Sequence, residues 1–291
     1  MSSVGTRTFT VSSFDGTSLA AREFGEGDGT PVLLVNAIGP DMSAWKRVVD
    51  AWPEPRRILS WDFRGLHGSS EPGSDRNDAA AHCEDALAVV DAAGVDSFVV
   101  AAWSTGTRIA LEIARSYPER AGAVALVCGG FGRGFLGLFR YLEVSSVFPM
   151  GAGLAKHFAS SLEGPFRAFV SRPEIAGVVR QSGVIGPTAD VETLVQVVQS
   201  FASCDLRRLL ATYEEVVGAS DVSILSQVHA PTLAIAGGRD RFTTGGMVEA
   251  MVRRMPNAEK VVYENASHFL PLEYPDRLAS DMEGFFRLSE R

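Results

Sequence analysis

The 291-residue chain is predicted to be an α/β protein, in which a mostly parallel eight-stranded sheet carries helices on both faces. Three observations predict this class. The chain opens with a hairpin pattern, strand-like and helix-like segments then alternate strictly, and a long irregular stretch interrupts the alternation before it resumes. Strict alternation is typical of parallel sheets because a crossover helix must return the chain to the end of the sheet where the previous strand began.

The opening hairpin is predicted from two short strand-like runs around an Asp15-Gly16 turn. The run at 97–102 is short, β-branched and aromatic, as a buried parallel strand should be, and good helix formers follow it. The predicted strands are residues 7–11, 18–24, 31–35, 57–61, 97–102, 121–128, 231–236 and 259–263. The predicted helices are residues 43–52, 78–93, 107–117, 244–255 and 271–288.

The interruption, residues 129–217, is helical and irregular in character and rich in Phe, Leu and Val. We expect it to be a helical cap inserted into a core domain that consists of residues 1–128 and 218–291. Ligands of parallel sheets bind at the carboxyl edge of the strands. The cap is therefore expected to lie over that edge.

Composition limits the function classes. The 46% hydrophobic and 21% charged residues are typical of a globular protein, and the net charge of −8 offers no basic stripe for nucleic acid. Three cysteines without paired spacing suggest neither a disulfide framework nor a zinc site, which favours a reducing, cytoplasmic location. No apolar stretch approaches a membrane span. A small-molecule substrate is the expected partner, and a homodimer stays open.

The pentapeptide Ala102-Trp103-Ser104-Thr105-Gly106 lies between a predicted strand and a predicted helix. A sharp strand-to-helix turn forces its central serine into a strained backbone conformation, so that only small residues fit two positions away on either side. The pattern is typical of a nucleophilic serine. Alone it is weak evidence, because similar pentapeptides occur by chance and a serine at a strand end is usually a plain turn residue.

A serine hydroxyl needs a base within hydrogen-bond reach and an acid that orients the base. Asp240 follows the strand that ends at 236, and His268 follows the next strand, so both are predicted at the same edge as Ser104. Taken singly, Asp240 could cap the helix near Thr244 and His268 could be a surface histidine. Together, the order Ser, Asp, His at three strand ends predicts a catalytic triad.

The other histidines, His67, His82, His157 and His229, have no partner at metal-ligand spacing, so structural or surface roles are expected. Neither a metal nor an organic cofactor is expected.

The oxyanion of an acyl-transfer intermediate needs preorganised N–H donors. We expect one from the backbone of Thr105 and the other from the loop that follows residue 35, with Ile38 as the best candidate. Trp103 and Phe269, the neighbours of the predicted nucleophile and base, are expected to contact substrate.

On these residues the chain resembles the α/β-hydrolase superfamily over nearly its whole length. The matching segments are residues 35–45, 62–69, 102–106, 237–240 and 265–268. The loop Asn36-Ala37-Ile38-Gly39 is similar to the Asn-Ser-Leu-Gly of 3-oxoadipate enol-lactonases, within an esterase and lactonase-like branch. The resemblance therefore implies the α/β-hydrolase fold and a carboxylic ester or lactone substrate.

The chain departs from the enol-lactonase pattern in two ways that bear on the expected substrate. Leu66 is inserted into the usual Arg-Gly-His-Gly turn. The expected cap also carries several phenylalanines, which favour an apolar substrate if some line the cavity, although most are expected to pack the cap against itself or against the sheet. They are Phe131, Phe135, Phe139, Phe148, Phe158, Phe166 and Phe169.

The expected function is ester or lactone hydrolysis through an acyl-enzyme, with activity falling as His268 becomes protonated. A carbon-carbon bond hydrolase, a thioesterase and an acyltransferase would use the same three residues. From another class, the chain could be a ligand-binding or sensing protein with a degenerate hydrolase site. Fold alone does not separate these alternatives.

Overall fold

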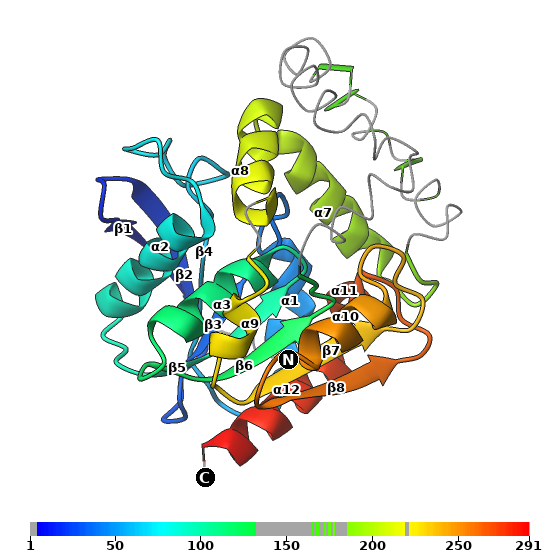
Figure 1. Ribbon diagram of the computed structural model, residues 1–291. Coiled ribbons are helices and arrows are strands. Elements are labelled where there is room, and N and C mark those ends of the chain that lie inside the picture. Colours follow the sequence, from blue (N-terminus) through cyan, green and yellow to red (C-terminus); the bar gives the residue numbers. More distant parts are fainter. Residues whose placement is uncertain are drawn as a thin grey trace.

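The computed structural model describes residues 5–131, 164–165, 167–168, 172, 174–175, 177, 185–218 and 221–290. Its centre is an eight-stranded sheet in the order β1-β2-β4-β3-β5-β6-β7-β8 (Figure 1). β1 and β2 form the antiparallel hairpin, β2 is antiparallel to β4, and all other neighbours are parallel. The predicted sheet is confirmed. The strands are β1 (Thr6–Ser12), β2 (Ser18–Phe24), β3 (Val32–Val35), β4 (Ile58–Trp61), β5 (Phe98–Trp103), β6 (Ala121–Val127), β7 (Thr232–Gly237) and β8 (Ala258–Tyr263).

The helices cover both faces of this sheet, as Figure 1 shows. Those of the described residues are α1 (Ser43–Asp50), α2 (Ala79–Ala92), α3 (Gly106–Ser116), α7 (Val191–Ser203), α8 (Leu206–Gly218), α9 (Ile224–Gln227), α10 (Gly245–Val252), α11 (Leu270–Glu273) and α12 (Pro275–Ser289). One expectation was wrong, because the closing helix predicted at 271–288 is two helices. Pro275 has no N–H to donate and its ring disfavours a helical residue before it, and Tyr274 accordingly leaves the helical region with φ −136° and ψ 50°.

Side chains that alternate along β5 fill two separate cores. Phe98, Val100 and Ala102 belong to the core shared with α2, α3 and α10. Val99 and Trp103 point to the opposite core, which α1, α11 and α12 close. Every residue of β5 is buried, because a central parallel strand is covered on both faces. Ser104 therefore follows a strand that is buried along its whole length.

Helices α7 and α8 stand beyond the carboxyl ends of the strands (Figure 1). Apart from Gly218, they fall within the range 129–217 that is expected to form the cap, and most of residues 132–184 lie outside the described residues. Of the seven phenylalanines named for the cap, Phe131 is described and the other six lie outside, as does His157.

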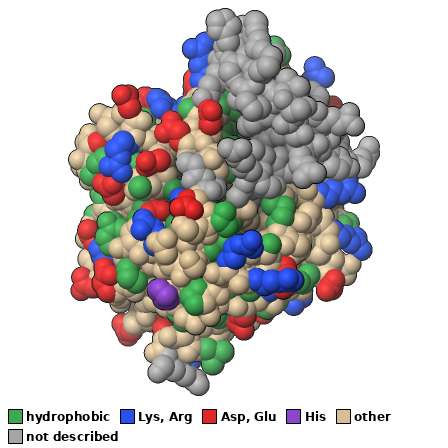
Figure 2. Space-filling view, viewed as in Figure 1, with side chains coloured by type: hydrophobic (Ala, Val, Ile, Leu, Met, Phe, Trp, Pro, Cys, Tyr) green, Lys and Arg blue, Asp and Glu red, His purple; other side chains and the backbone are tan. Residues whose placement is uncertain are grey.

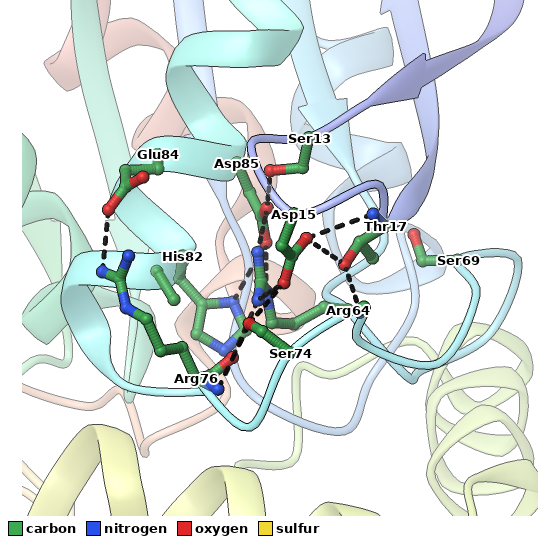
Figure 3. A network of polar contacts seen from close by, with 12 residues as sticks. Ser13, Asp15, Thr17, Arg64, Ser69, Ser74, Arg76, His82, Glu84 and Asp85 are labelled. Carbon is green, nitrogen blue, oxygen red and sulfur yellow. Dashed lines mark hydrogen bonds and ion pairs between the residues drawn. The ribbon is translucent and has the colours of Figure 1, made fainter.

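A buried ion pair ties the hairpin to the sheet and α2 (Figure 3). The Arg64 guanidinium is fully buried and donates to both carboxylate oxygens of Asp85, at 2.8 and 2.6 Å. It also donates to the carboxylate of Asp15 in the hairpin turn at 3.0 Å. The bidentate geometry and the additional acceptors compensate for the desolvation of these charges.

His82 lies beside this ion pair and is fully buried (Figure 3). Neither ring nitrogen has a hydrogen-bond partner among the described residues. Burial, assisted by the charge of Arg64, lowers the pKa of His82 from 6.5 to about 3. Between these two values the unfolded chain binds a proton that the native chain does not, so the free energy of unfolding falls as the pH falls through this window.

Replacing His82 with leucine should remove this pH dependence. On moving from about pH 7 to about pH 5, His82→Leu is expected to lose about 2 kcal/mol less stability than the wild type. Urea unfolding at the two pH values measures the difference, and His229→Leu, at an exposed histidine, is the matched control. Parallel losses in the wild type and His82→Leu would contradict a histidine held neutral by burial.

The inserted Leu66 is accommodated by a turn with left-handed backbone at Gly65 (φ 72°) and His67 (φ 51°). Its side chain is buried in the core, so the insertion is part of the packing rather than a surface bulge.

The three cysteines are free and buried. Acidic and basic side chains are both spread over the face in Figure 2. Among the described helices, none combines the length and apolar character that crossing a membrane requires.

Candidate active site

Ser104 lies in the turn between β5 and α3 with left-handed backbone, at φ 54°. A side chain at Gly106 would bring its Cβ to 2.3 Å from the carbonyl oxygen of Asn36, so glycine is required there. Ala102 is fully buried in β5. The steric argument made from the pentapeptide therefore holds in the structure, and the strain keeps the serine side chain at the carboxyl edge.

The structure brings together the three residues predicted to form a triad. The Oγ of Ser104 lies 2.7 Å from Nε2 of His268. On the other side of the ring, Nδ1 of His268 lies 2.8 Å from Oδ2 of Asp240. All three side chains are buried or nearly so, which strengthens both hydrogen bonds. With the ring proton on Nδ1, the imidazole presents an acceptor to the serine hydroxyl.

Asp240 is fixed by its own loop. Its second oxygen, Oδ1, accepts hydrogen bonds from the backbone N–H groups of Phe242 and Thr243, both at 2.8 Å. Asp240 does not cap the helix near Thr244, because these two N–H groups precede Thr244, the N-cap of α10. One carboxylate oxygen instead holds the loop before the helix, while the other contacts His268. The two roles coexist because a carboxylate has two oxygens with separate lone pairs.

Cys128, which the sequence did not single out, lies directly after β6 beside this pair. Its Sγ and the ligand atoms of Asp240 and His268 lie within 4.8 Å of one another, so the three could in principle surround a metal ion. Burial, and then the charge of Asp240, raise the pKa of the Cys128 thiol well above its usual value. A neutral thiol is a poor metal ligand, and Asp240 and His268 are already hydrogen-bonded to each other. The residues present therefore fit a proton-transfer site better than a metal site.

The loop expected to supply an oxyanion donor is held by Asn36. Its amide nitrogen donates to the carbonyl oxygens of Pro40 and Asp41, both at 2.8 Å, and its Oδ1 accepts from the N–H of Ala37. The N–H of Ile38 donates to the side-chain Oγ1 of Thr105 at 2.7 Å. The two residues predicted to line the oxyanion hole are thus in direct contact.

His67 and Cys204 secure the same loop from the other side. Nε2 of His67 lies 2.8 Å from the carbonyl oxygen of Gly39, and Sγ of Cys204 donates to that oxygen at 3.3 Å. The structural role expected for His67 thus has a definite partner. Since Cys204 follows α7, the position of the loop depends on the helices above it.

Glu273 is a second residue that sequence reasoning missed. Its buried carboxylate accepts from the N–H and hydroxyl of Ser267, next to His268, and from the N–H of Gly186 at 2.7 Å. In the sequence, a buried and hydrogen-bonded glutamate such as this one in α11 cannot be distinguished from a surface glutamate. Its effect is to tie the histidine loop to the segment that leads into α7.

A cavity of about 410 Å³ borders Ser104 and His268. The loop of Ala37, Ile38 and Pro40 forms one wall. Helices α7 and α8 supply apolar side chains such as Val197, Phe201 and Leu210. Among the described lining residues, none carries a carboxylate, an ammonium or a guanidinium group. The cavity therefore favours an uncharged, apolar ligand.

Trp103 and Phe269, the predicted contact residues, both line this cavity. The Nε1 of Trp103 donates to the carbonyl oxygen of His268 at 2.9 Å, so this residue also fixes the histidine loop. Phe242, which was not predicted, lines the cavity too, with its ring centroid 5.0 Å from that of His268. These aromatic contacts limit the positions that the imidazole ring can adopt.

Comparison with known proteins gives one family and several similar chains. The family model described as alpha/beta hydrolase fold matches residues 30–275. The dihydrolipoyllysine-residue acetyltransferase component of the acetoin cleaving system of Pseudomonas putida is 26% identical over 267 residues, covering 91% of this chain. This chain spans only 65% of the length of that protein. The pimeloyl-[acyl-carrier protein] methyl ester esterase of Aliivibrio fischeri (strain MJ11) is 23% identical over 265 residues, covering 89% of this chain and 95% of the esterase.

Among solved structures, the enol-lactonase from Burkholderia xenovorans LB400 superposes with a TM-score of 0.75 at 21% identity. The match covers 96% of this chain and 100% of the lactonase. At this identity the likeness concerns the fold.

Proposed function

Because the chain belongs to the alpha/beta hydrolase fold family, we propose that it is a serine hydrolase that cleaves a carboxylic ester or lactone of a small apolar molecule. The observation that carries the proposal is the continuous hydrogen-bonded chain from Ser104 through His268 to Asp240 at the wall of an apolar cavity. Nucleophile, base and orienting acid are already within reach of one another.

In the proposed reaction, His268 takes the Ser104 proton at Nε2 as Oγ attacks the substrate carbonyl carbon. The resulting oxyanion is stabilised in the hole formed by Thr105 and the Ile38 loop. His268 then gives its proton to the leaving alkoxide, which leaves an acyl-enzyme. Water, deprotonated by the same imidazole, attacks the acyl carbon and releases the acid and Ser104. Asp240 holds the ring in the required tautomer throughout.

The apolar walls support an uncharged acyl or alcohol group. Each methylene that moves from water into the cavity contributes about 0.8 kcal/mol, or about fourfold in kcat/KM when it is buried in the transition state. We propose that Trp103 and Phe269 contact this group. We also propose that α7 and α8, with the rest of residues 129–217, form the cap that selects it, over a core of residues 1–128 and 218–291.

Narrowing the cavity should shorten the preferred acyl chain. Leu210→Trp is expected to lower kcat/KM for p-nitrophenyl octanoate by about tenfold while changing that for the acetate by less than about threefold. Leu210 is half-buried at the cavity wall, so the larger ring enters the cavity rather than a packed core. Leu288→Trp, at an exposed position, is the control. An equal loss for both esters would show that the acyl chain does not reach Leu210.

Three related activities and one binding role remain as alternatives. Release of a shortened acid from a vinylogous diketone would identify carbon-carbon bond hydrolysis. Turnover of a thioester would identify a thioesterase, and transfer of the acyl group to an acceptor other than water would identify an acyltransferase. A fluorophosphonate separates enzyme from sensor, since rapid labelling at Ser104 supports the former and its absence the latter. We propose a cytoplasmic location, supported by the three free cysteines.

A further inference from the structure

The side-chain hydroxyl of Thr105 contacts a backbone N–H that was expected to donate to the oxyanion. The N–H of Ile38, one of the two expected donors, is directed at Oγ1 of Thr105 over 2.7 Å. Both residues are almost fully buried, at 4% exposure for Ile38 and 5% for Thr105, and both line the cavity with Ser104. The side chain of Thr105 therefore lies between the loop donor and the space beside the nucleophile.

Helix capping does not account for this hydroxyl. Thr105 is the N-cap of α3, and a threonine there normally accepts a hydrogen bond from an N–H in the first turn of its helix. In this helix the N-cap side chain makes no such bond, and the backbone has helical angles of φ −60° and ψ −27°. The hydroxyl is instead turned away from α3 and toward the loop of Ile38.

Two protons of Thr105, on its hydroxyl and on its backbone nitrogen, have no hydrogen-bond acceptor among the described residues. A threonine hydroxyl accepts through lone pairs and donates one proton. Oγ1 accepts from Ile38, and its own proton has no acceptor among the residues that the structure describes. The backbone N–H of Thr105, at the start of α3, also has no acceptor in the described part of the chain, as is usual for the first N–H groups of a helix.

We propose that Thr105 gives the oxyanion two hydrogen bonds, one from its backbone N–H and one from its Oγ1–H, and that the Ile38 N–H acts through this hydroxyl. This inference rests on the proposed serine acyl transfer. By donating to Oγ1, the Ile38 N–H fixes the hydroxyl and polarises its O–H bond, since hydrogen bonds in a chain strengthen one another. No bond to Thr105 is made or broken, and its proton stays on Oγ1 throughout.

The loop holds the Ile38 N–H in place for this role. Asn36 braces the loop from within through three hydrogen bonds, and His67 and Cys204 hold the carbonyl of Gly39. Preorganised donors stabilise a developing charge without reorganisation during the reaction. The competing arrangement has the hydroxyl swing aside so that Ile38 donates directly, in which case the hydroxyl only occupies the hole between reactions.

Thr105→Val and Thr105→Ser separate the two arrangements. Valine keeps the shape and removes the hydroxyl, and serine keeps the hydroxyl and removes the methyl. For p-nitrophenyl butyrate we expect kcat of Thr105→Val to fall by about 10²-fold to 10³-fold with KM changed by less than about threefold. Thr105→Ser should stay within about fivefold of the wild type. Thr105→Ala provides a second hydroxyl-free variant should valine impair folding.

The affinity for a trifluoromethyl ketone inhibitor is a second measurement, which would not change if Thr105 had a purely structural role. The ketone adds to a serine Oγ and places an oxyanion in the hole, so its affinity should fall by about the same factor as kcat in the valine and alanine variants. Equal or higher kcat in both hydroxyl-free variants would overturn the proposal in favour of direct donation by Ile38. A serine variant as slow as valine would also overturn it. If the wild type shows no Ser104-dependent turnover or labelling, the proposed function and this inference fall together.

Discussion

Ser104→Ala should lower kcat/KM for p-nitrophenyl butyrate by at least about 10³-fold and abolish labelling by a fluorophosphonate. The alanine leaves His268 and Asp240 in place but removes the only atom that can form the acyl-enzyme in the proposed reaction. Because Ser104 has left-handed backbone at φ 54°, alanine experiences the same backbone strain and the melting temperature should change little. Steady-state kinetics, mass spectrometry of the labelled protein and thermal melting measure the three effects.

Ser116→Ala is the matched control, since Ser116 lies at the opposite end of α3 from Ser104 and its hydroxyl contacts Glu112 rather than the triad. It should keep wild-type turnover and labelling. Retained esterase activity in Ser104→Ala would sink the assignment of the nucleophile.

Asp240→Asn should lower kcat by about 10⁴-fold with little effect on the fold. Oδ1 of Asp240 accepts from the N–H groups of Phe242 and Thr243. Because only an oxygen can accept these bonds, the carbonyl oxygen of an asparagine must take the place of Oδ1. The NH₂ group then faces Nδ1 of His268 and forces this nitrogen to accept. The ring proton moves to Nε2, which faces Ser104. A protonated Nε2 has no free lone pair and cannot accept the serine proton.

Turnover and the rate of fluorophosphonate labelling should fall together in Asp240→Asn, because both need the activated serine. Asp221→Asn offers a matched control, since Asp221 also accepts from the N–H two residues ahead but is exposed and does not line the cavity beside Ser104. An Asp240→Asn enzyme with more than about a tenth of the wild-type kcat would contradict the role of Asp240 as the orienting acid.

The sheet could be predicted closely because its signals are local. Every predicted strand is present, with ends within one residue of those expected. Short β-branched runs and the helical runs between them are properties of neighbouring residues, and parallel alternation leaves few possible topologies. The error at the closing helix had a local cause as well, since Pro275 was visible in the sequence and marked the break.

The candidate site divides differently. Ser104, Asp240 and His268 could be named because their order and their places after strands are sequence properties. Cys128, Phe242 and Glu273 could not, because a thiol, a phenylalanine and a glutamate acquire their contacts with the histidine loop only when distant strands and helices meet.

The sequence by itself determined the architecture and the residue types at three strand ends, since both follow from short-range patterns along the chain. Tertiary structure alone decided that Ser104 and Asp240 lie at hydrogen-bond distance from opposite sides of one imidazole, and that the Ile38 N–H meets the Thr105 hydroxyl. Such contacts join residues from 28 to 164 positions apart, and their lengths depend on the twist and packing of the whole sheet. The cavity has the same origin, because α7 and α8 become its walls only where they cross the carboxyl edge.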